Sequence, residues 1–364
     1  MCSTRYRSRI PAVRPPVAQR QSQEVVITIS ELGEFGLISA ITAAATTAGA
    51  TTAGTGAGAT DADNLIVGPG DDAAVLRLPD SRVVATTDML IEGRHFRTEW
   101  SGAADIGHKA AARNLADVAA MGAVPTALLV GFAGPGTLAV DWVLELVAGI
   151  ASECLATGAR VVGGDTSSAE LVLLAITALG DLRGAEPVTR GGARPGDVVA
   201  VAGTLGSAAA GLALLAAGAD AGAAAGLADL VNAHRRPRPP YAAGPQAAEL
   251  AATSLIDVSD GLIADLGHVA DASGVRIELT ASRLAAEPIA RVGALRQAAA
   301  LLAKADWVPW VLTGGDDHAL VATFPPKVIL PSAWTPVGIV TKGHGVAIDG
   351  NIWTDSGGWE HFRS

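Results

Sequence analysis

The chain has 364 residues, a length that suits about two domains of ~150 residues each. Apolar residues make up 49% and charged residues 17%, which excludes a chain that is disordered throughout. The net charge of -10 argues against a nucleic-acid-binding protein, which is usually basic. The two cysteines, Cys2 and Cys154, cannot build a disulfide framework, so we expect a cytoplasmic location. No apolar run reaches the ~18–20 residues of a membrane helix, so no membrane segment is expected.

The beginning of the chain is unusual in composition. Residues 1–20 contain five arginines and no acidic residue, and we predict a disordered basic arm over residues 1–30. A transit peptide is the alternative interpretation of such a start. Residues 34–41 predict a short amphipathic helix. Residues 42–60 contain only Ala, Thr and Gly, and they are predicted to form a flexible surface loop.

Turn residues at 68–72 introduce the more regular part of the first half. Strands at 73–78 and 83–87 are expected to pair as a hairpin around the turn at 79–81. The elements expected after this hairpin are a helix at 104–121, a strand at 126–132, a helix at 141–156, and strands at 160–163 and 171–179.

The second half begins near the glycine-rich loop at 191–197. Its expected elements are a strand at 198–202, a helix from 207, a helix at 241–252, a strand at 254–258, a helix at 262–272, and alternating strands and loops thereafter. Strands mixed with helices in both halves indicate an α/β or α+β fold. We expect an N-terminal domain at 31–183, which includes the flexible segment 42–60, and a C-terminal α/β domain at 184–364.

Aspartates recur beside apolar strands at breaks rich in glycine or polar residues. The runs are Gly70-Asp71-Asp72, Thr86-Thr87-Asp88, Gly163-Gly164-Asp165-Thr166, Asp257-Val258-Ser259-Asp260-Gly261 and Gly314-Gly315-Asp316-Asp317. Any one of them alone is typical of an ordinary turn. Five at predicted strand ends suggest carboxylates gathered at one rim of a sheet. Oxygen ligands of this kind favour Mg²⁺, which usually meets substrate phosphates.

Two further features leave alternatives open. Asn114 and Asp117 share a helix face three residues apart, which suits an inward-facing ligand pair. Asp117 is also four residues from Arg113, and the two residues form an exposed ion pair in the alternative interpretation. Residues 203–207 place a glycine turn before a helix, where backbone amides bind anions, although this signal is common.

Several of these runs, read together, resemble the thiamine-monophosphate kinase family. The runs are GPGDDAAVL, TTDMLIEGRHF, KAAARNLADVAAMGA, GGDTS, PVTRGGARPGD, IDVSDGL followed by DLGH, and TGGDDHAL, in the family's order. The resemblance covers the chain from about residue 34 onwards. It implies a two-domain fold of the aminoimidazole-ribonucleotide synthetase type, a homodimer whose N-terminal sheets pair into a barrel, and transfer of a phosphoryl group from ATP to thiamine monophosphate.

The resemblance also implies roles for individual residues. The implied Mg²⁺ ligands are Asp72, Thr86, Thr87, Asp88, Asp117, Asp165, Asp257 and Asp260. The implied ATP contacts are Gly164, Asp165, Arg190 and Ser259. The implied substrate contacts are His95, Asp316 and Trp359. The family more often has Glu at Asp316 and Tyr at His318, and the basic arm and the segment 42–60 lie outside the resemblance.

The implied chemistry needs no dedicated catalytic acid or base. The acceptor is a phosphate monoester whose second pKa is ~6, so its oxygen is largely deprotonated at neutral pH. We therefore expect direct in-line transfer assisted by several Mg²⁺ ions. Two alternatives remain at this point. One is another ATP-dependent enzyme of the superfamily, such as an aminoimidazole-ribonucleotide or selenophosphate synthetase. The other is a non-catalytic nucleotide- or metal-binding regulator.

Overall fold

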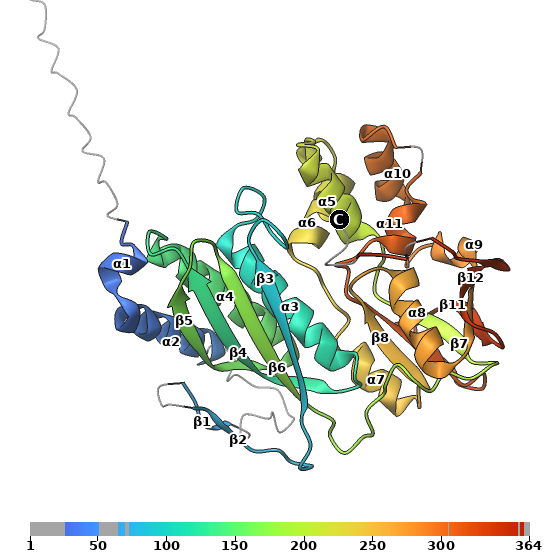
Figure 1. Ribbon diagram of the computed structural model, residues 1–364, viewed down its shortest axis with the longest axis horizontal. Helices are drawn as coiled ribbons and strands as arrows, with labels where there is room; N and C mark the ends of the chain where they lie inside the picture. Colours follow the sequence, from blue (N-terminus) through green and yellow to red (C-terminus); the bar gives the residue numbers. More distant parts are fainter. Residues whose placement is uncertain (1–25, 51–64, 70–72, 305, 356, 360–364) are drawn as a thin grey trace, which may run out of the picture.

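The described residues form two large β-sheets, one from each half of the chain, and one small two-stranded sheet near the beginning of the chain (Figure 1). The structure is a computed structural model, and it describes residues 26–50, 65–69, 73–304, 306–355 and 357–359. Helices pack against both sheets, so the mixed α/β content expected from the sequence is confirmed. Of the expected site residues, only Asp72 lies outside the described part of the chain.

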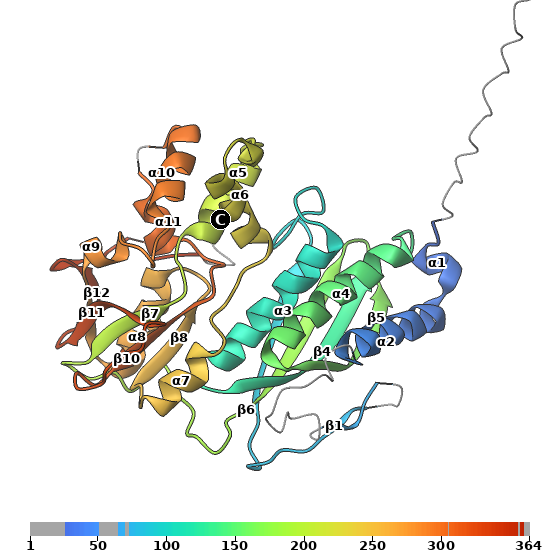
Figure 2. The ribbon, with the colours of Figure 1, turned by 180° about the vertical axis from the view of Figure 1, so that it is seen from behind.

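The first sheet has four strands in the order β3-β6-β4-β5. Its strands are β3 (Val84–Ile91), β4 (Val124–Gly134), β5 (Arg160–Ser168) and β6 (Leu173–Asp181). The pairs β3–β6 and β4–β6 are antiparallel, and β4–β5 is parallel. Helices α3 (Ala103–Ala119) and α4 (Val140–Thr157) cover one face of this sheet, as Figures 1 and 2 show from opposite sides. Leu90 and Ile176 pack there against Leu115 and Leu146.

The opposite face of the four-stranded sheet carries no helix among the described residues (Figure 1). Because side chains alternate along a strand, Thr87 and Met89 of β3 point to this face while their neighbours point to α3. Met89 is 45% exposed and Leu129 of β4 is 37% exposed. Within the described residues of one subunit, this apolar face therefore has no covering layer.

Residues near the beginning of the chain are more ordered than expected. Thr28 forms a β-bridge with Ala139, so the predicted disordered arm over residues 1–30 is wrong for residues 26–30. Helices α1 (Ile29–Leu32) and α2 (Glu34–Ala50) follow. The loop predicted at 42–60 is wrong for residues 42–50, because the Ala-rich run continues the helix that begins at Glu34 and α2 packs against α4. Residues 1–25 and 51–64 lie outside the described part.

The expected hairpin is also wrong in its pairing. Strand β2 (Val75–Leu76) is two residues long and pairs with β1 (Leu65–Val67). Strand β3 pairs instead with β6, along eight residues. The pairing of β3 with β6 is favoured over a local hairpin because it buries the Leu90 side chain against α3. A hairpin of β2 and β3 alone does not bury this side chain.

The second sheet has seven strands in the order β13-β12-β9-β11-β7-β10-β8. They are β7 (Val198–Ala202), β8 (Ser254–Val258), β9 (Arg276–Leu279), β10 (Ala319–Phe324), β11 (Thr335–Thr341), β12 (Gly345–Ile348) and β13 (Asn351–Ile352). The helices of this half are α5 (Ser207–Ala216), the 3-10 turn η2 (Ala221–Ala223), α6 (Ala225–Arg235), α7 (Ala243–Glu249), α8 (Leu262–Ser273), α9 (Ala281–Leu284), α10 (Val292–Leu301) and α11 (Val308–Thr313).

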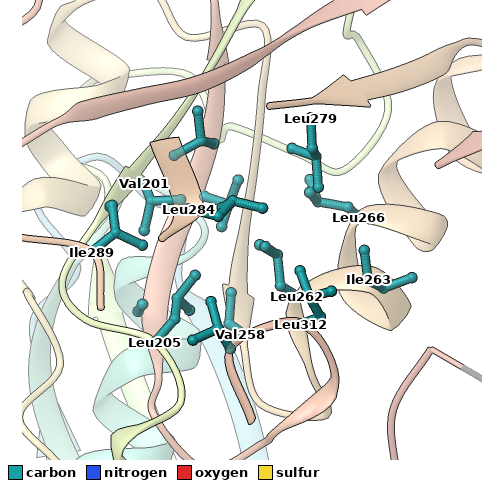
Figure 3. Packing of buried hydrophobic residues seen from close by; sticks show 14 of the residues in the cluster. Val201, Leu205, Val258, Leu262, Ile263, Leu266, Leu279, Leu284, Ile289 and Leu312 are labelled. Carbon is teal, nitrogen blue, oxygen red and sulfur yellow. The ribbon is translucent and has the colours of Figure 1, made fainter. Parts of the chain in front are cut away.

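Strand β7 separates two hydrophobic cores in the second half. Val199 and Val201 point into the larger core, part of which Figure 3 shows around Leu205, Val258 and Leu262. Ala200 and Ala202 point to the other face, where a smaller core also takes up residues of α7 and the end of α3. The smaller core therefore packs the first half of the chain against the second.

Candidate active site at the junction of the two halves

Helix α3 presents a row of charged side chains to the junction. Lys109, Arg113 and Asp117 are spaced four residues apart, so they lie on one face of the helix. Of these three residues, only Asp117 was expected from the sequence to be a ligand. Arg113 lies four residues before Asp117 and Lys109 lies eight residues before it, and this regular spacing is the signal that would have found the two cations.

Strand β3 supplies the next two side chains. Thr86 and Asp88 are two residues apart and therefore share the face toward α3. The Thr86 hydroxyl donates a hydrogen bond to Asp117 Oδ2 at 2.9 Å. Arg113 Nε and Nη2 lie 2.9 and 2.8 Å from Asp88 Oδ2. The Arg113 side chain is only 12% exposed, which excludes the exposed Arg113–Asp117 ion pair of the alternative interpretation.

The loop before β10 brings a carboxylate from the second half to the same place. Asp316 lies 2.7 Å from Lys109 Nζ and 3.3 Å from Arg113 Nη1. Burial alone would raise the pKa of the Asp316 carboxyl, but Lys109 and Arg113 outweigh it and hold that pKa below its usual range. The Asp316 N–H donates to the Ser259 carbonyl at 2.9 Å. This bond ties the loop to the end of β8.

The end of β8 adds four more of the expected residues. Asp257 is buried, and its Oδ2 lies 3.2 Å from His318 Nδ1. Ser259 and Asp260 follow directly after the strand. The Trp359 N–H donates to the Asp260 carbonyl at 3.0 Å, which brings the C-terminal Gly-Gly-Trp segment to this strand end. Trp359 is 58% exposed.

Two buried aspartates hold the loops in place by binding backbone amides. Asp317 accepts N–H bonds from Gly206 at 2.6 Å and Ala208 at 2.8 Å. The expected anion site at 203–207 is therefore occupied by a carboxylate of the protein itself. Asp265 likewise accepts N–H bonds from Ser259, Asp260 and Gly261, at 3.1, 3.2 and 3.1 Å.

Three expected residues lie apart from this group. Thr87 points to the uncovered face of the sheet, where its hydroxyl accepts a bond from Thr177. Gly164 and Asp165 lie within β5, at the edge of the sheet opposite to β3. With two strands between them, β3 and β5 are about 14 Å apart. In addition, Asp88 and Asp165 lie inside strands rather than at their ends, contrary to the expected pattern.

Two other expected contacts lie in connecting segments. Arg190 is exposed, and its carbonyl accepts a bond from the Ser273 hydroxyl. His95 follows β3, and its Nδ1 accepts the Ile91 N–H at 3.0 Å. This bond orients the His95 ring near the end of β3.

Neighbouring carboxyl groups in the site change the pKa of Asp117. Burial, Asp257 and Asp88 raise the pKa of Asp117 to about 7, against the opposing effect of His318 and the Thr86 hydrogen bond. Beside it, Asn114 is fully buried, and its Oδ1 has no hydrogen-bond partner among the described residues. No cluster of three or more His, Cys, Asp or Glu side chains arranged to hold a metal ion occurs within the described residues.

Comparison with known proteins identifies the chain. Residues 70–182 match the family model for the AIR synthase related protein, N-terminal domain. The thiamine-monophosphate kinase of Mycobacterium tuberculosis is 44% identical over 336 residues, which cover 92% of this chain and 93% of that protein. The chain belongs to the thiamine-monophosphate kinase family. The expected family and enzyme class, a phosphotransferase with a phosphate group as acceptor, are thereby confirmed.

Solved structures of the thiamine-monophosphate kinase family share the fold. The enzyme from Stenotrophomonas maltophilia K279a has a TM-score of 0.71 at 35% identity, over 80% of this chain and 93% of that one. AaThiL complexed with AMPPCP and TMP has a TM-score of 0.71 at 30% identity, over 93% of this chain and 100% of that one. The predicted two-domain α/β fold is thus confirmed. Among the helices that the structure describes, none is long and apolar enough to span a bilayer.

Proposed function

We propose that this protein uses ATP to phosphorylate thiamine monophosphate, giving thiamine diphosphate and ADP. The observation that carries the proposal is the convergence of Asp88 and Asp117 with Asp257 and Asp316 from the other half of the chain. Membership of the kinase family supports the reaction, and so does the likeness to AaThiL complexed with AMPPCP and TMP. Identifying the products by ³¹P NMR tests it, since thiamine diphosphate must appear together with ADP.

The acids of this site are suited to hard cations. Asp117 is held with a pKa of about 7 by burial and neighbouring carboxylates, an environment that a bound cation would relieve. Asp72, Thr86, Thr87, Asp88, Asp117, Asp165, Asp257 and Asp260 are the proposed Mg²⁺ ligands. When bound, Mg²⁺ supplies positive charge that offsets repulsion between the two phosphate-bearing substrates.

Phosphoryl transfer is proposed to be direct and in line. The acceptor is a phosphate monoester with a second pKa of ~6, so it needs no strong base at neutral pH. The residues of the chain act by positioning the donor and acceptor, which supplies most of the rate in such reactions. Incubation with γ-labelled ATP without acceptor tests this step, because stable label on the protein would exclude direct transfer.

The substrate contacts follow from the family resemblance. Gly164, Asp165, Arg190 and Ser259 are proposed to bind ATP, and His95, Asp316 and Trp359 to bind thiamine monophosphate. The Asp316 N–H donates to the Ser259 carbonyl, and the Trp359 N–H donates to the carbonyl of the next residue, so the three proposed contacts lie around the end of β8. The exposed Trp359 ring offers a flat face for the cationic, aromatic thiamine.

We also propose a homodimer that covers the open face of the four-stranded sheet. Met89 and Leu129 expose apolar surface there, and the face has no covering helix in the described chain. Thr87 and Asp165 point to the same face. A second subunit would therefore cover Met89 and Leu129. It would also approach Thr87 and Asp165, the proposed ligands that lie far from the other carboxylates within one subunit.

We propose two domains for the chain. Residues 31–183 form the domain for nucleotide binding, metal binding and dimerisation, and residues 184–364 form the second domain. The enzyme is proposed to be cytoplasmic.

A further inference from the structure

Two buried cations on α3 have no role in the function proposed above. Lys109 is 2% exposed, and the Arg113 side chain is 12% exposed. Lysine and arginine are rarely buried without a partner. Their partners here are Asp316 and Asp88, the residues proposed for the acceptor and for metal binding. The two cations therefore lie where anionic substrates are expected.

Both cations contact the same carboxylate, that of Asp316. Arg113 directs Nε and Nη2 to Asp88 and Nη1 to Asp316, so a single guanidinium spans carboxylates from both halves of the chain. Its contact with Asp316, at 3.3 Å, is longer than the 2.7 Å contact of Lys109 with the same carboxylate. Because Lys109 and Arg113 are one helical turn apart, they approach Asp316 from the same side.

Two histidine nitrogens around Asp316 have no hydrogen-bond partner within the part of the chain that the structure describes. His234 Nδ1 lies 3.9 Å from one carboxylate oxygen, and His318 Nε2 lies 3.8 Å from the other. Both rings are at least nine-tenths buried, and neither atom has a hydrogen-bond partner in the described residues. Buried polar atoms are nearly always hydrogen-bonded, so these two mark a place for a polar group of a ligand.

We propose that Lys109 and Arg113 bind the phosphate group of the acceptor, exchanging their contacts with Asp316 and Asp88 for phosphate oxygens. The inference rests on the proposed function, which supplies the acceptor. The Arg113 fork suits two phosphate oxygens, and Lys109 adds a compact charge. The unpartnered nitrogens of His234 and His318 lie around the same carboxylate. Positively charged side chains of the protein thus bind the acceptor phosphate.

The test compares binding of thiamine monophosphate with binding of unphosphorylated thiamine, by calorimetry, without nucleotide or divalent cations. The wild-type enzyme is expected to bind thiamine monophosphate about ten- to hundredfold more tightly, as charge-assisted hydrogen bonds imply. Lys109→Met and Arg113→Met should each reduce that preference about tenfold and leave the affinity for thiamine unchanged. Arg113→Lys, which keeps the charge without the fork, should retain part of it.

Arg236→Met is the matched control, because Arg236 pairs with Asp105 on the same helix and is 40% exposed. It should leave the preference intact. A wild-type enzyme without the preference overturns the inference, and so do variants that lose affinity for both ligands equally. If circular dichroism shows that Lys109→Met is unfolded, the binding preferences of Arg113→Met and Arg113→Lys test the inference instead. Turnover of thiamine monophosphate is measured in a separate assay. If the enzyme turns over thiamine monophosphate but does not bind it more tightly than thiamine, only this inference is overturned. If the enzyme shows the binding preference but no turnover, only the proposed function is overturned.

Discussion

The hydroxyl of Tyr241 donates a 2.6 Å hydrogen bond to Oε1 of Glu153, joining the segment before α7 to helix α4. The other Glu153 oxygen lies 2.8 Å from His108 Nδ1, and His108 Nε2 lies 2.7 Å from the Pro237 carbonyl. This buried chain of contacts connects α3 and α4 to the connector that follows α6. It therefore helps to fix the helix that carries Lys109 relative to the second half.

Tyr241→Phe should destabilise the protein without changing its packing, because only the hydroxyl is removed. Glu153 would keep its charge and lose one of its two partners, so the free energy of unfolding should fall by about 1.5–3 kcal/mol. Urea denaturation measures this loss. Arg291→Ala, which breaks an exposed ion pair with Asp229, is the control and should cost less than about 1 kcal/mol. Equal effects of the two variants would contradict the role of the buried contact.

Asp117→Asn should preserve the fold and weaken Mg²⁺ binding. The amide is nearly the same shape and can still accept the Thr86 hydroxyl bond, but it removes a negative charge from the proposed cation site. Titration of activity with Mg²⁺ should show at least about a tenfold rise in the half-saturating concentration. Asp229→Asn, at an exposed pair, is the control. An unchanged Mg²⁺ requirement would remove Asp117 from the ligand set.

Asp317→Ala should loosen the loop that carries Asp316. The change leaves the Gly206 and Ala208 N–H groups without their acceptor in a buried place. The expected loss is about 1–3 kcal/mol of stability for each group left unsatisfied. Thermal unfolding measures it, and the KM for thiamine monophosphate should rise as well. A variant with wild-type stability would show that Asp317 does not anchor the loop.

The local order of helices and strands was largely predictable from the sequence, but strand pairing was not. Strands β7 and β8 have the predicted bounds, because each is a short apolar run between clear turn signals. The partner of β3 was missed because the paired residues lie far apart in the sequence, from 82 positions for Ile91 and Leu173 to 96 positions for Val84 and Gly180, and local pattern does not report such contacts. The extension of α2 to Ala50 was missed because its Ala and Thr residues show no amphipathic pattern.

The site was predictable only in part, for a related reason. The aspartate-containing runs pointed to Asp88, Asp257 and Asp316, and the structure brings these residues close to α3. Lys109 and Arg113 were overlooked because a charged residue in a helix usually faces solvent, and only tertiary contact shows that these two are buried. The separation of Asp165 from the other carboxylates depends on strand order, which the sequence alone did not specify.

Met89→Asp should separate the proposed dimer. A carboxylate on the open face of the sheet would be buried without a partner in the dimer, while in one subunit the position is 45% exposed. Sedimentation velocity should therefore show a monomer for this variant and a dimer for the wild-type chain. Ile329→Asp is the control, since Ile329 is 91% exposed elsewhere. A monomeric wild-type protein would contradict the proposed assembly.

Release of ADP shows whether the phosphate of thiamine monophosphate is the acceptor of the phosphoryl group. A coupled assay with ATP and Mg²⁺ compares thiamine monophosphate with unphosphorylated thiamine as acceptor at equal concentrations. We expect rapid ADP release with thiamine monophosphate and only background release with thiamine, because thiamine lacks the phosphate oxygen that receives the phosphoryl group. Equal rates with the two acceptors, or no release with either one, would contradict it.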